Sequence, residues 1–570
     1  MSGGVRNPMR MAFSAVGALA AAALLAACGG GGGSSGSQSF PISIKVTGLT
    51  SGTLTLQDNG SDSVTVYGST TSTFGTQIAA GALYDVTVSQ QPSGQNCVVL
   101  SGAGAANGNV SVNVVCSPST PKAWTWIAGS QTAGAIGSYG TVGVPGGFPG
   151  ARYGAASWAD GAGNLWLFGG DAVASASAIG IFSDLWKFDT NSGTWTWWEP
   201  ATSNGTAYQS GVANVGSSSY PGARVFASTW FNRSTGEAWL FGGIGCGNSS
   251  GCSSSTVQAQ NDLWMFTPNG GWTLVAAGSS TPSSSYPGAR FGASTWIDQA
   301  GDLWMFGGNG VAVDATTGDL NDLWELVPGA ATWTKVSGGG SASTTAVSGD
   351  TCSLPSPPAR QDAVSWFDGA NLWLFGGAVV STTSSSATQT YYADLWEYTP
   401  PTANSPGSWH CWPGNPPAAG GGQPYSPAAR DDAVAWVDPH TGYFWLYGGE
   451  GYTGVGSGSG AEGYFNDLWY FDPGSMTPGS GKQQWTEVST TTTENGCTTT
   501  PSGTSPAASW CAGAYGSSPG TSSVTSFPGA RYGAAGWVDA NGDFWLFGGG
   551  GYDSSATAVG DLNDLWRYVP

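Results

Sequence analysis

One arrangement of residues recurs six times along this chain of 570 residues. Each repeat contains an Arg, a Trp six positions later, an apolar run closed by two glycines, a loop of variable length and the triplet Asp-Leu-Trp. The repeat arginines are Arg152, Arg224, Arg290, Arg360, Arg430 and Arg531. The triplet aspartates are Asp184, Asp262, Asp322, Asp394, Asp467 and Asp564. Such a repeat constrains the fold strongly, because each unit has to bury its apolar face against its neighbours.

Each repeat predicts four short strands. In the third repeat, Arg290 opens the first strand, a tight turn spans 298–301, and a second strand at 303–306 ends at the glycine pair. The third strand begins next to Asp322, and the fourth contains Trp333. The second strands are apolar on both faces, as expected of sheets packed between two other sheets. Units of four strands repeated in series are typical of a β-propeller, and the Trp rings are expected to fill the space between its sheets.

The last repeat predicts how the ring closes. It stops at Pro570, before a fourth strand, whereas residues 123–128 have the composition of a fourth strand and precede the first repeat. This N-terminal strand is therefore predicted to complete the last of six blades over 122–570. The glycine pair after an apolar strand, the Asn-Asp-Leu-Trp element and the fourth-strand Trp resemble the Kelch repeat and the propeller domain of the galactose oxidase superfamily. The resemblance implies a six-bladed Kelch-type β-propeller.

The first 39 residues predict export rather than a folded core. Two arginines precede an apolar run that is shorter than the roughly 20 residues of a membrane span. Residues 1–27 are therefore predicted to be a signal peptide, and the residues before Cys28 resemble the lipobox of bacterial lipoproteins. That resemblance implies lipidation of Cys28, a Gly/Ser tether at 28–39 and attachment to the outer membrane, on its periplasmic or surface side. The alternative is a plain signal peptide with an incidental Cys.

Residues 40–118 predict a second, smaller all-β domain. They contain no Trp, and five segments alternate apolar with polar residues between turn residues, as expected of short strands. The segments are 42–46, 53–56, 63–66, 85–88 and 110–115. The pattern predicts an antiparallel β-sandwich and resembles the immunoglobulin-like or transthyretin-like modules that follow the anchor in bacterial lipoproteins. A spacer is favoured over a ligand-binding module.

Eight cysteines follow Cys28, an even number that suits disulfides in an oxidising compartment. Neighbour pairing predicts Cys97–Cys116, Cys246–Cys252, Cys352–Cys411 and Cys497–Cys511. No two of these cysteines have C-x-x-C spacing, and the chain has only two histidines, His410 and His440. A zinc site is therefore disfavoured, and we expect no metal and no cofactor.

The formal net charge of −20 disfavours binding to nucleic acid. Six of the 15 Lys and Arg are the repeat arginines, and two arrangements are open for them. The six guanidinium groups can surround the mouth of the central channel, where they would suit a carboxylate or sulfate ligand. Alternatively, each Arg crosses the glycine pair and forms an ion pair with the Asp of its own repeat. The ion pair is favoured, because a ligand site seldom needs six identical side chains.

Strand order predicts a loop-rich face. In a four-stranded meander, the loop between strands two and three lies at the same end as the loop into the next repeat, and these loops carry the long insertions. Loops on a rigid scaffold commonly bind ligands. Aromatic residues in the insertions suit stacking on a sugar or contact with a protein, or they pack within their own loops. They are Tyr391, Tyr392, Tyr452, Tyr464, Phe465, Trp510, Tyr515 and Tyr552.

Three hypotheses for the function remain. The preferred one is an envelope-anchored monomer that binds a glycan or a protein through the loop-rich face. The second is an enzyme. Copper-dependent galactose oxidase activity is nearly excluded, because copper needs convergent ligands and His410 and His440 lie in separate repeats. The six-bladed Kelch type is also similar to bacterial sialic-acid epimerases, which implies acid–base chemistry on a carbohydrate, but nothing outside the repeat singles out an acid–base pair. The third is a structural envelope component.

Overall fold

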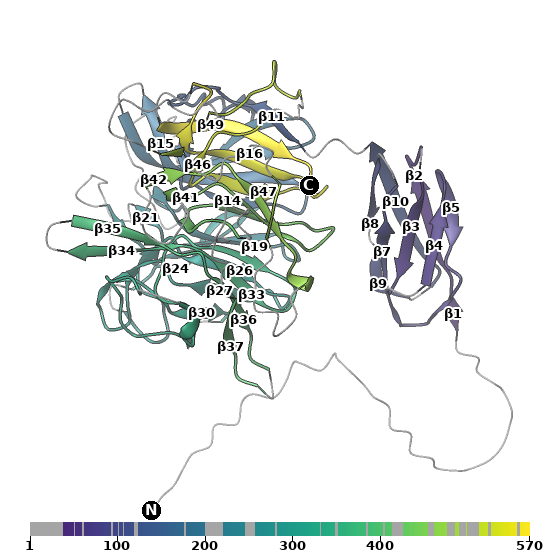
Figure 1. The fold of residues 1–570 in the computed structure, drawn as a ribbon, viewed down its shortest axis with the longest axis horizontal. Helices are drawn as coiled ribbons and strands as arrows, with labels where there is room; N and C mark the ends of the chain where they lie inside the picture. Colours follow the sequence, from purple (N-terminus) through teal and green to yellow (C-terminus); the bar gives the residue numbers. More distant parts are fainter. Residues whose placement is uncertain are drawn as a thin grey trace, which may run out of the picture. The chain divides into compact units, whose positions relative to one another are not determined.

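The computed structural model describes residues 38–570 with gaps. The undescribed residues are 1–37, 51, 60–61, 93–94, 101, 107, 119–122, 176–177, 200–219, 246–256, 280–281, 331, 348–350, 384–385, 403–404, 413–425, 454–460, 476–484, 489–496, 499–511, 522–525 and 556–558. The predicted signal peptide and Cys28 lie outside the described residues. The chain divides into two compact units, Met1–Ser119 and Thr120–Pro570 (Figure 1). Within the described range, no helix is long and apolar enough to cross a bilayer.

The first unit consists mainly of two four-stranded sheets that share one apolar core. Alternate residues of neighbouring strands, such as Ile42, Ile44, Leu54 and Leu56, are fully buried in that core. The unit is therefore a β-sandwich. Its strands, in spatial order, are β5 (Thr70–Thr73), β2 (Ile42–Thr47), β10 (Val110–Pro118) and β8 (Gln95–Leu100) in one sheet, β4 (Asp62–Val66), β3 (Leu54–Asp58), β7 (Leu83–Gln90) and β9 (Ala103–Ala105) in the other, and the pair β1 (Ser39–Phe40) and β6 (Ile78–Ala79).

Strands β2 and β10 run parallel, which corrects the prediction of a purely antiparallel sandwich. They lie near the two ends of the unit's sequence, so the intervening chain is long enough for the crossover that parallel strands require. A disulfide joins Cys97 in β8 to Cys116 in β10, as predicted.

Within the described residues, the second unit contains six main sheets, one for each repeat, and each is built on four antiparallel strands. The first three sheets contain β14 (Ala156–Ala159), β15 (Asn164–Ser175), β16 (Ala178–Asp189) and β17 (Thr194–Glu199); β19 (Ser228–Asn232), β20 (Glu237–Phe241), β23 (Leu263–Thr267) and β24 (Gly271–Ala276); and β26 (Ser294–Ile297), β27 (Leu303–Phe306), β30 (Leu323–Leu326) and β31 (Thr334–Ser337). The other three contain β32 (Val364–Phe367), β33 (Leu372–Phe375), β36 (Leu395–Thr399) and β37 (Ser408–Trp412); β39 (Val434–Val437), β40 (Phe444–Tyr447), β43 (Leu468–Phe471) and β44 (Trp485–Glu487); and β47 (Ala535–Val538), β48 (Phe544–Tyr552), β49 (Val559–Tyr568) and β11 (Trp124–Ala128).

The first strands of the six sheets form a closed ring. They contact one another in the order β14, β19, β26, β32, β39, β47 and back to β14. Strand β11, which precedes the first repeat, pairs antiparallel with β49 at the end of the chain. Sheets that radiate from one ring of first strands define a β-propeller. The incomplete sixth repeat thus obtains its outer strand from the start of the unit.

Tryptophan side chains hold neighbouring sheets together. The indole N–H of Trp230 donates to the backbone oxygen of Trp304 in the next repeat at 2.9 Å. Trp296, Trp366 and Trp537 make the same contact with the repeat that follows each of them. All of these donor rings are buried. These four Trp residues therefore belong to the frame, with their polar atom satisfied as burial requires.

Strands two and three continue beyond the glycine pair as hairpins, and in most repeats a short strand at the repeat arginine pairs with the hairpin. In the first repeat, β13 (Arg152–Tyr153) pairs with the part of β15 that follows Gly170. The remaining elements of this unit are β12 (Pro145–Gly147), β18 (Arg224–Val225), β21 (Ile244–Gly245), β22 (Gln258–Ala259), β25 (Arg290–Phe291), β28 (Asn309–Val311), β29 (Thr317–Asp319), η1 (Thr351–Ser353), β34 (Ala378–Thr383), β35 (Ser386–Tyr391), β38 (Arg430–Asp431), β41 (Glu450–Thr453), β42 (Ala461–Tyr464), η2 (Pro473–Ser475), β45 (Cys497–Thr498) and β46 (Arg531–Tyr532). The repeat arginines and the hairpin insertions therefore lie at the same end of the propeller.

Candidate functional site

Each repeat arginine forms a buried ion pair with the aspartate of its own repeat. In the first repeat, Arg152 Nη1 lies 2.8 Å from Asp184 Oδ1, and Nη2 lies 2.9 Å from Oδ2. The same guanidinium donates to the carbonyl oxygens of Gly169 and Gly150. At 2.6–2.8 Å, the other pairs are Arg224 with Asp262, Arg290 with Asp322, Arg360 with Asp394, Arg430 with Asp467, and Arg531 with Asp564.

These contacts leave the repeat arginines unable to bind a ligand. All six are 1% exposed, and their donors are directed to an aspartate and to backbone oxygens. Burial disfavours the charge of Asp184, but the Arg152 guanidinium and hydrogen bonds hold the pKa of that carboxyl below its usual value. The predicted ion pair is therefore present within each repeat, and the alternative ring of unpaired arginines is not.

Some loop aromatics support these ion pairs. The ring of Tyr392 lies 4.3 Å from the guanidinium carbon of Arg360. The hydroxyl of Tyr515 donates to Asp564 at 2.7 Å. These two rings therefore contribute to the frame, through a cation–π contact and a hydrogen bond to a buried carboxylate.

The other predicted loop aromatics differ in their exposure. Tyr391, Tyr552 and Phe465 are buried, like Tyr392, so they present no open face on which a sugar could stack. The centroid of the Phe465 ring lies 4.1 Å from the guanidinium carbon of Arg430. Tyr464 is partly exposed and stacks on Tyr532, with ring centroids 4.9 Å apart. Two further candidates fall outside the described side chains, Tyr452 and Trp510.

Two of the predicted disulfides lie within the described residues. Besides Cys97–Cys116 in the first unit, Cys352 in η1 is bonded to Cys411 in β37. The second bond ties the loop before Arg360 to the outer strand of the same repeat. The predicted pairs Cys246–Cys252 and Cys497–Cys511 involve side chains outside the described part of the chain.

A closed ring of main-chain hydrogen bonds lies two residues after the repeat arginines, and we call it the mouth ring. Each N–H of this ring donates to the carbonyl of the equivalent residue in the preceding repeat, at 2.8–3.0 Å. The donor and acceptor pairs are Gly154 to Gly533, Gly533 to Asp432, Asp432 to Asp362, Asp362 to Gly292, Gly292 to Phe226 and Phe226 to Gly154. All six residues have φ between 48° and 62°. The ring therefore depends on one left-handed backbone conformation in every repeat.

Three residues of the mouth ring are not glycine. They are Phe226, Asp362 and Asp432, with φ of 56°, 55° and 48°. A left-handed conformation costs a residue with a Cβ on the order of 1 kcal/mol, whereas glycine adopts it freely. Strain of this kind is concentrated at binding and catalytic sites. The two carboxyl groups and the phenyl ring are thus held at the mouth ring at a cost to stability.

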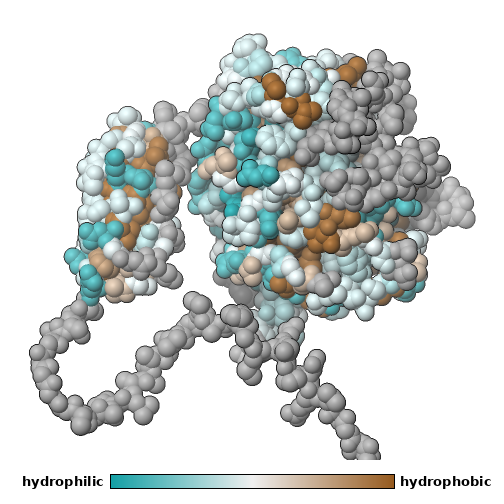
Figure 2. All heavy atoms as spheres, turned by 180° about the vertical axis from the view of Figure 1, so that it is seen from behind, coloured by the Kyte–Doolittle hydropathy of each residue, from teal (hydrophilic) through white to brown (hydrophobic). Residues whose placement is uncertain are grey.

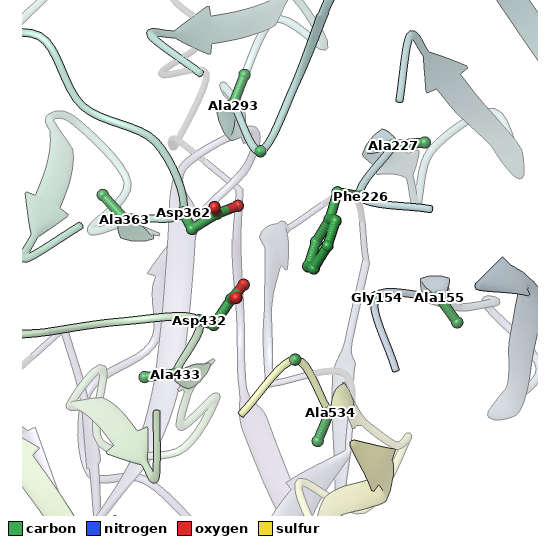
Figure 3. Close-up of a pocket in the computed structure, with 12 residues that line it drawn as sticks. Gly154, Ala155, Phe226, Ala227, Ala293, Asp362, Ala363, Asp432, Ala433 and Ala534 are labelled. Carbon is green, nitrogen blue, oxygen red and sulfur yellow. The ribbon is translucent and has the colours of Figure 1, made fainter. Parts of the chain in front are cut away.

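A pocket of about 190 Å³ lies at the mouth ring. Figure 3 shows the carboxyl groups of Asp362 and Asp432 on one side of the pocket, both directed toward its centre, with the ring of Phe226 on the other side. Neighbouring glycines leave room for these side chains. A Cβ on Gly292 would lie 2.2 Å from an Asp362 carboxyl oxygen, and a Cβ on Gly154 would lie 3.1 Å from the Phe226 ring. The alanine that follows each ring residue completes the lining.

Burial and mutual repulsion raise the pKa values of the carboxyl groups around this pocket. Burial and the charges of Asp432 and Asp319 raise the pKa of Asp362 well above its usual value. Burial and Glu450 raise the pKa of Asp432 to about 7, and burial and Glu462 raise the pKa of Glu450 to about 7. Asp432 is therefore partly protonated near neutral pH and can either donate or accept a hydrogen bond there.

A row of aromatic rings begins at Phe226. Its centroid lies 5.9 Å from that of Tyr153, which lies 5.7 Å from that of Tyr532, the partner of Tyr464. Tyr153 and Tyr532 directly precede residues of the mouth ring and are partly exposed. The site thus combines carboxyl groups with aromatic surface, the two kinds of group that commonly contact sugars.

Asp362 and Asp432 were not identified from the sequence, which offered no acid–base pair outside the repeat. The sequence feature that could have identified them is a difference between the repeats at one position. The second residue after the Arg is Gly in three repeats and Phe in one, but Asp in the fourth and fifth. An alignment of the repeats against one another finds this departure, whereas the pattern that defines the repeat excludes it.

The fold and the mouth ring define a β-propeller with an acidic pocket on its central axis. No protein-family model matches the chain, and no curated protein matches it. Among solved structures, the chain is similar to one titled "Structure of YjhT", with 14% sequence identity and a TM-score of 0.41; the match covers 75% of this chain and 95% of that chain.

Proposed function

We propose that this chain is a six-bladed Kelch-type propeller that binds a carbohydrate at the mouth of its central channel. The observation that carries this proposal is the replacement of Gly by Asp at two adjacent positions of the mouth ring, with both carboxyl groups directed into one pocket. Glycine would suit a purely structural ring better, since it adopts the required φ at no steric cost, whereas Asp does so less readily. The side chains at these positions therefore serve a ligand.

The size and lining of the pocket suit a single sugar unit. Its volume of about 190 Å³ is below the roughly 300–1,000 Å³ of sites for drug-sized ligands. The carboxyl groups of Asp362 and Asp432 would hydrogen-bond ligand hydroxyls, and the Phe226 ring would pack against the apolar face of the sugar. The backbone groups of the ring are already paired with one another. Selectivity would therefore come from the three side chains.

A second candidate function, an enzyme that acts on the bound carbohydrate, is favoured by the two unlike carboxyl groups. The pKa values of both Asp362 and Asp432 are raised, so one carboxyl group would act as the acid in its protonated form and the other as the base. Pairs of carboxyl groups with separated pKa values are a common arrangement for proton transfer. Such chemistry needs no metal or cofactor, and no group of three or more metal-ligating side chains is found among the described residues.

The N-terminal residues support a location in the cell envelope. The apolar segment before Cys28 and the Gly/Ser tether support a lipid-anchored envelope protein, with the first unit, an immunoglobulin-like or transthyretin-like module, as a spacer. We also propose that the chain is a monomer; on the face shown in Figure 2, the hydrophobic residues of the described part form separate patches. Incorporation of radiolabelled palmitate by the natural chain and its loss in Cys28→Ala would test the anchor.

A glycan array tests the carbohydrate proposal. We expect saturable binding by the purified chain and its loss in the double variant Asp362→Gly/Asp432→Gly, which has the glycine found at three other positions of the mouth ring. NMR of the bound sugar then separates binding from turnover, since turnover should disappear in Asp432→Asn. Absence of glycan binding, or equal binding by the double variant, would contradict the proposal and leave a protein ligand or a structural role.

A further inference from the structure

The ionisable side chains that line the pocket are all acidic. Its lining contains two carboxyl groups and no basic side chain. The six arginines nearest in sequence are 1% exposed and occupied by ion pairs within their own repeats. Among the described residues, no ion pair reaches Asp362 or Asp432. An anionic ligand would therefore find no compensating cation at this site, whereas a cationic ligand would favour the ionised form of both carboxyl groups.

Further carboxyl groups lie behind the pocket. Asp431, next to Asp432 in the chain, is 2% exposed, and its Oδ1 has no hydrogen-bond partner, while its Oδ2 accepts from Gln389 at 2.5 Å. Glu450 pairs with Asp431 across β38 and β41. A buried carboxylate oxygen without a partner is costly in the empty protein. Binding of a cation nearby would lower that cost, because the interaction between charges is strong where water is excluded.

The aromatic side of the pocket suits a cation as well. The ring of Phe226 lies across from the two carboxyl groups, so a ligand between them contacts negative charge on one side and a π face on the other (Figure 3). Ammonium groups are bound by this combination, because an aromatic face carries partial negative charge. A neutral hydroxyl would gain little from the ring beyond contact area. Both sides of the pocket therefore favour a positively charged ligand.

We propose that the ligand of the mouth ring carries a protonated amine, an amino sugar being the class that fits, with its ammonium group placed between Asp362 and Asp432 and facing Phe226. This inference rests on the proposed function, since it specifies the carbohydrate that the same pocket would bind. It predicts that the amine gives the site its selectivity, and that acetylation of the amine removes the charge on which binding depends.

Calorimetry with matched glycosides tests the inference on the whole purified chain at neutral pH and low salt. The probes are the methyl glycosides of glucosamine and galactosamine, their N-acetylated forms, and the parent glucoside and galactoside. We expect an amino glycoside to bind at least about tenfold more tightly than its N-acetylated form, the size of one charge-assisted hydrogen bond. Asp362→Asn and Asp432→Asn should each remove that difference. Asp432→Gly should do the same, and glycine suits the local φ, so its folding is not in question.

The control is Asp314→Asn, which removes the same charge from an exposed residue that does not line the pocket. It should leave the affinity unchanged, which excludes a general attraction to a chain of net charge −20. If neutral or acetylated glycosides bind as tightly as amino glycosides, the inference is overturned while the carbohydrate proposal stands. If none of the six glycosides binds, both are overturned.

Discussion

The main-chain N–H of Asp432 donates to the carbonyl oxygen of Asp362 at 3.0 Å, and the carboxyl groups of the same two residues enter one pocket. The backbone link is part of the mouth ring, so the spacing of the two carboxyl groups is set by the frame of the propeller. Both residues adopt the left-handed conformation that the ring requires. At these two positions, the residue that would give the greatest stability is therefore not the one that would bind a ligand. Substitutions that change stability and affinity in opposite directions can test this.

The ion pair of Arg290 and Asp322 should contribute strongly to the stability of the propeller. Asp322→Ala leaves a buried guanidinium without its partner and should lower the free energy of unfolding by about 3–5 kcal/mol. Arg290→Met combined with Asp322→Leu should cost less than the two single changes together. Denaturant unfolding followed by Trp fluorescence reports this unit alone, because residues 40–118 contain no Trp. A coupling energy below about 0.5 kcal/mol would show that the pair is not a stabilising unit.

A turn aspartate should anchor the second-strand Trp in the third repeat. Asp298 Oδ2 accepts from Trp304 Nε1 at 3.0 Å, and its Oδ1 accepts from the N–H groups of Ala300 and Asp302. Asp298→Ala removes both acceptor oxygens, and with them three hydrogen bonds, and should cost about 2 kcal/mol of unfolding free energy. Asp298→Asn keeps an acceptor for the backbone and should cost about half as much. Equal losses in the two variants would mean that the indole contact, and not the turn, dominates.

Stability should fall as pH rises from about 5 to 8. Asp432 and Glu450 have pKa values of about 7 in the folded chain, and Asp543 and Asp561 of about 6, all above the roughly 4 of unfolded carboxyl groups. The folded chain therefore binds more protons than the unfolded chain in this window, so the unfolding free energy decreases with pH. The urea midpoint at pH 5, 6, 7 and 8 measures this trend.

A second group of carboxyls limits stability at the acid end. Asp184 and Asp322 have lowered pKa values, so their contribution is present above about pH 4 and is lost as the pH falls below it. The most stable pH should therefore lie near 5. The double variant Asp432→Gly/Glu450→Gln serves as the control and should flatten the slope above that pH. A midpoint that rises between pH 5 and 8 would contradict the assignment of raised pKa values around the pocket.

The frame could be predicted because it repeats. The order of residues from Arg152 to Asp184 recurs in the other five repeats with loops of different length, and it indicated strands, sheets and the ion pair, since a contact made in every repeat recurs as the same pair of residue types in the sequence. The strand at 124–128 followed from the incomplete last repeat. The site could not be predicted in the same way, because Asp362 and Asp432 occur where two repeats differ from the others.

Two other features depend on tertiary structure that a local pattern does not contain. Tyr391 and Tyr552 are buried in the strands β35 and β48, whereas composition alone places these aromatics in exposed loops. The parallel pairing of β2 with β10 joins strands far apart in the sequence, and alternation along a strand gives no information on the direction of its neighbour.

Gly533→Ala measures the backbone cost of the mouth ring by itself. A Cβ at this position would have no neighbouring atom closer than 3.4 Å, so the substitution meets ordinary contacts, but φ is 58°. We expect a loss of about 1 kcal/mol in the unfolding free energy. A loss well below this value would mean that the ring tolerates a Cβ, and the presence of Asp at two of its positions would then need no functional explanation.

The most direct test is to measure stability and binding together in Asp432→Gly at pH 8, where the carboxylate is ionised. The variant relieves the left-handed backbone and removes a buried charge next to Glu450, so the unfolding free energy should rise by about 1 kcal/mol or more while ligand affinity falls at least about tenfold. A variant that is less stable than the natural chain and binds its ligand equally well would show that Asp432 belongs to the frame and not to a site.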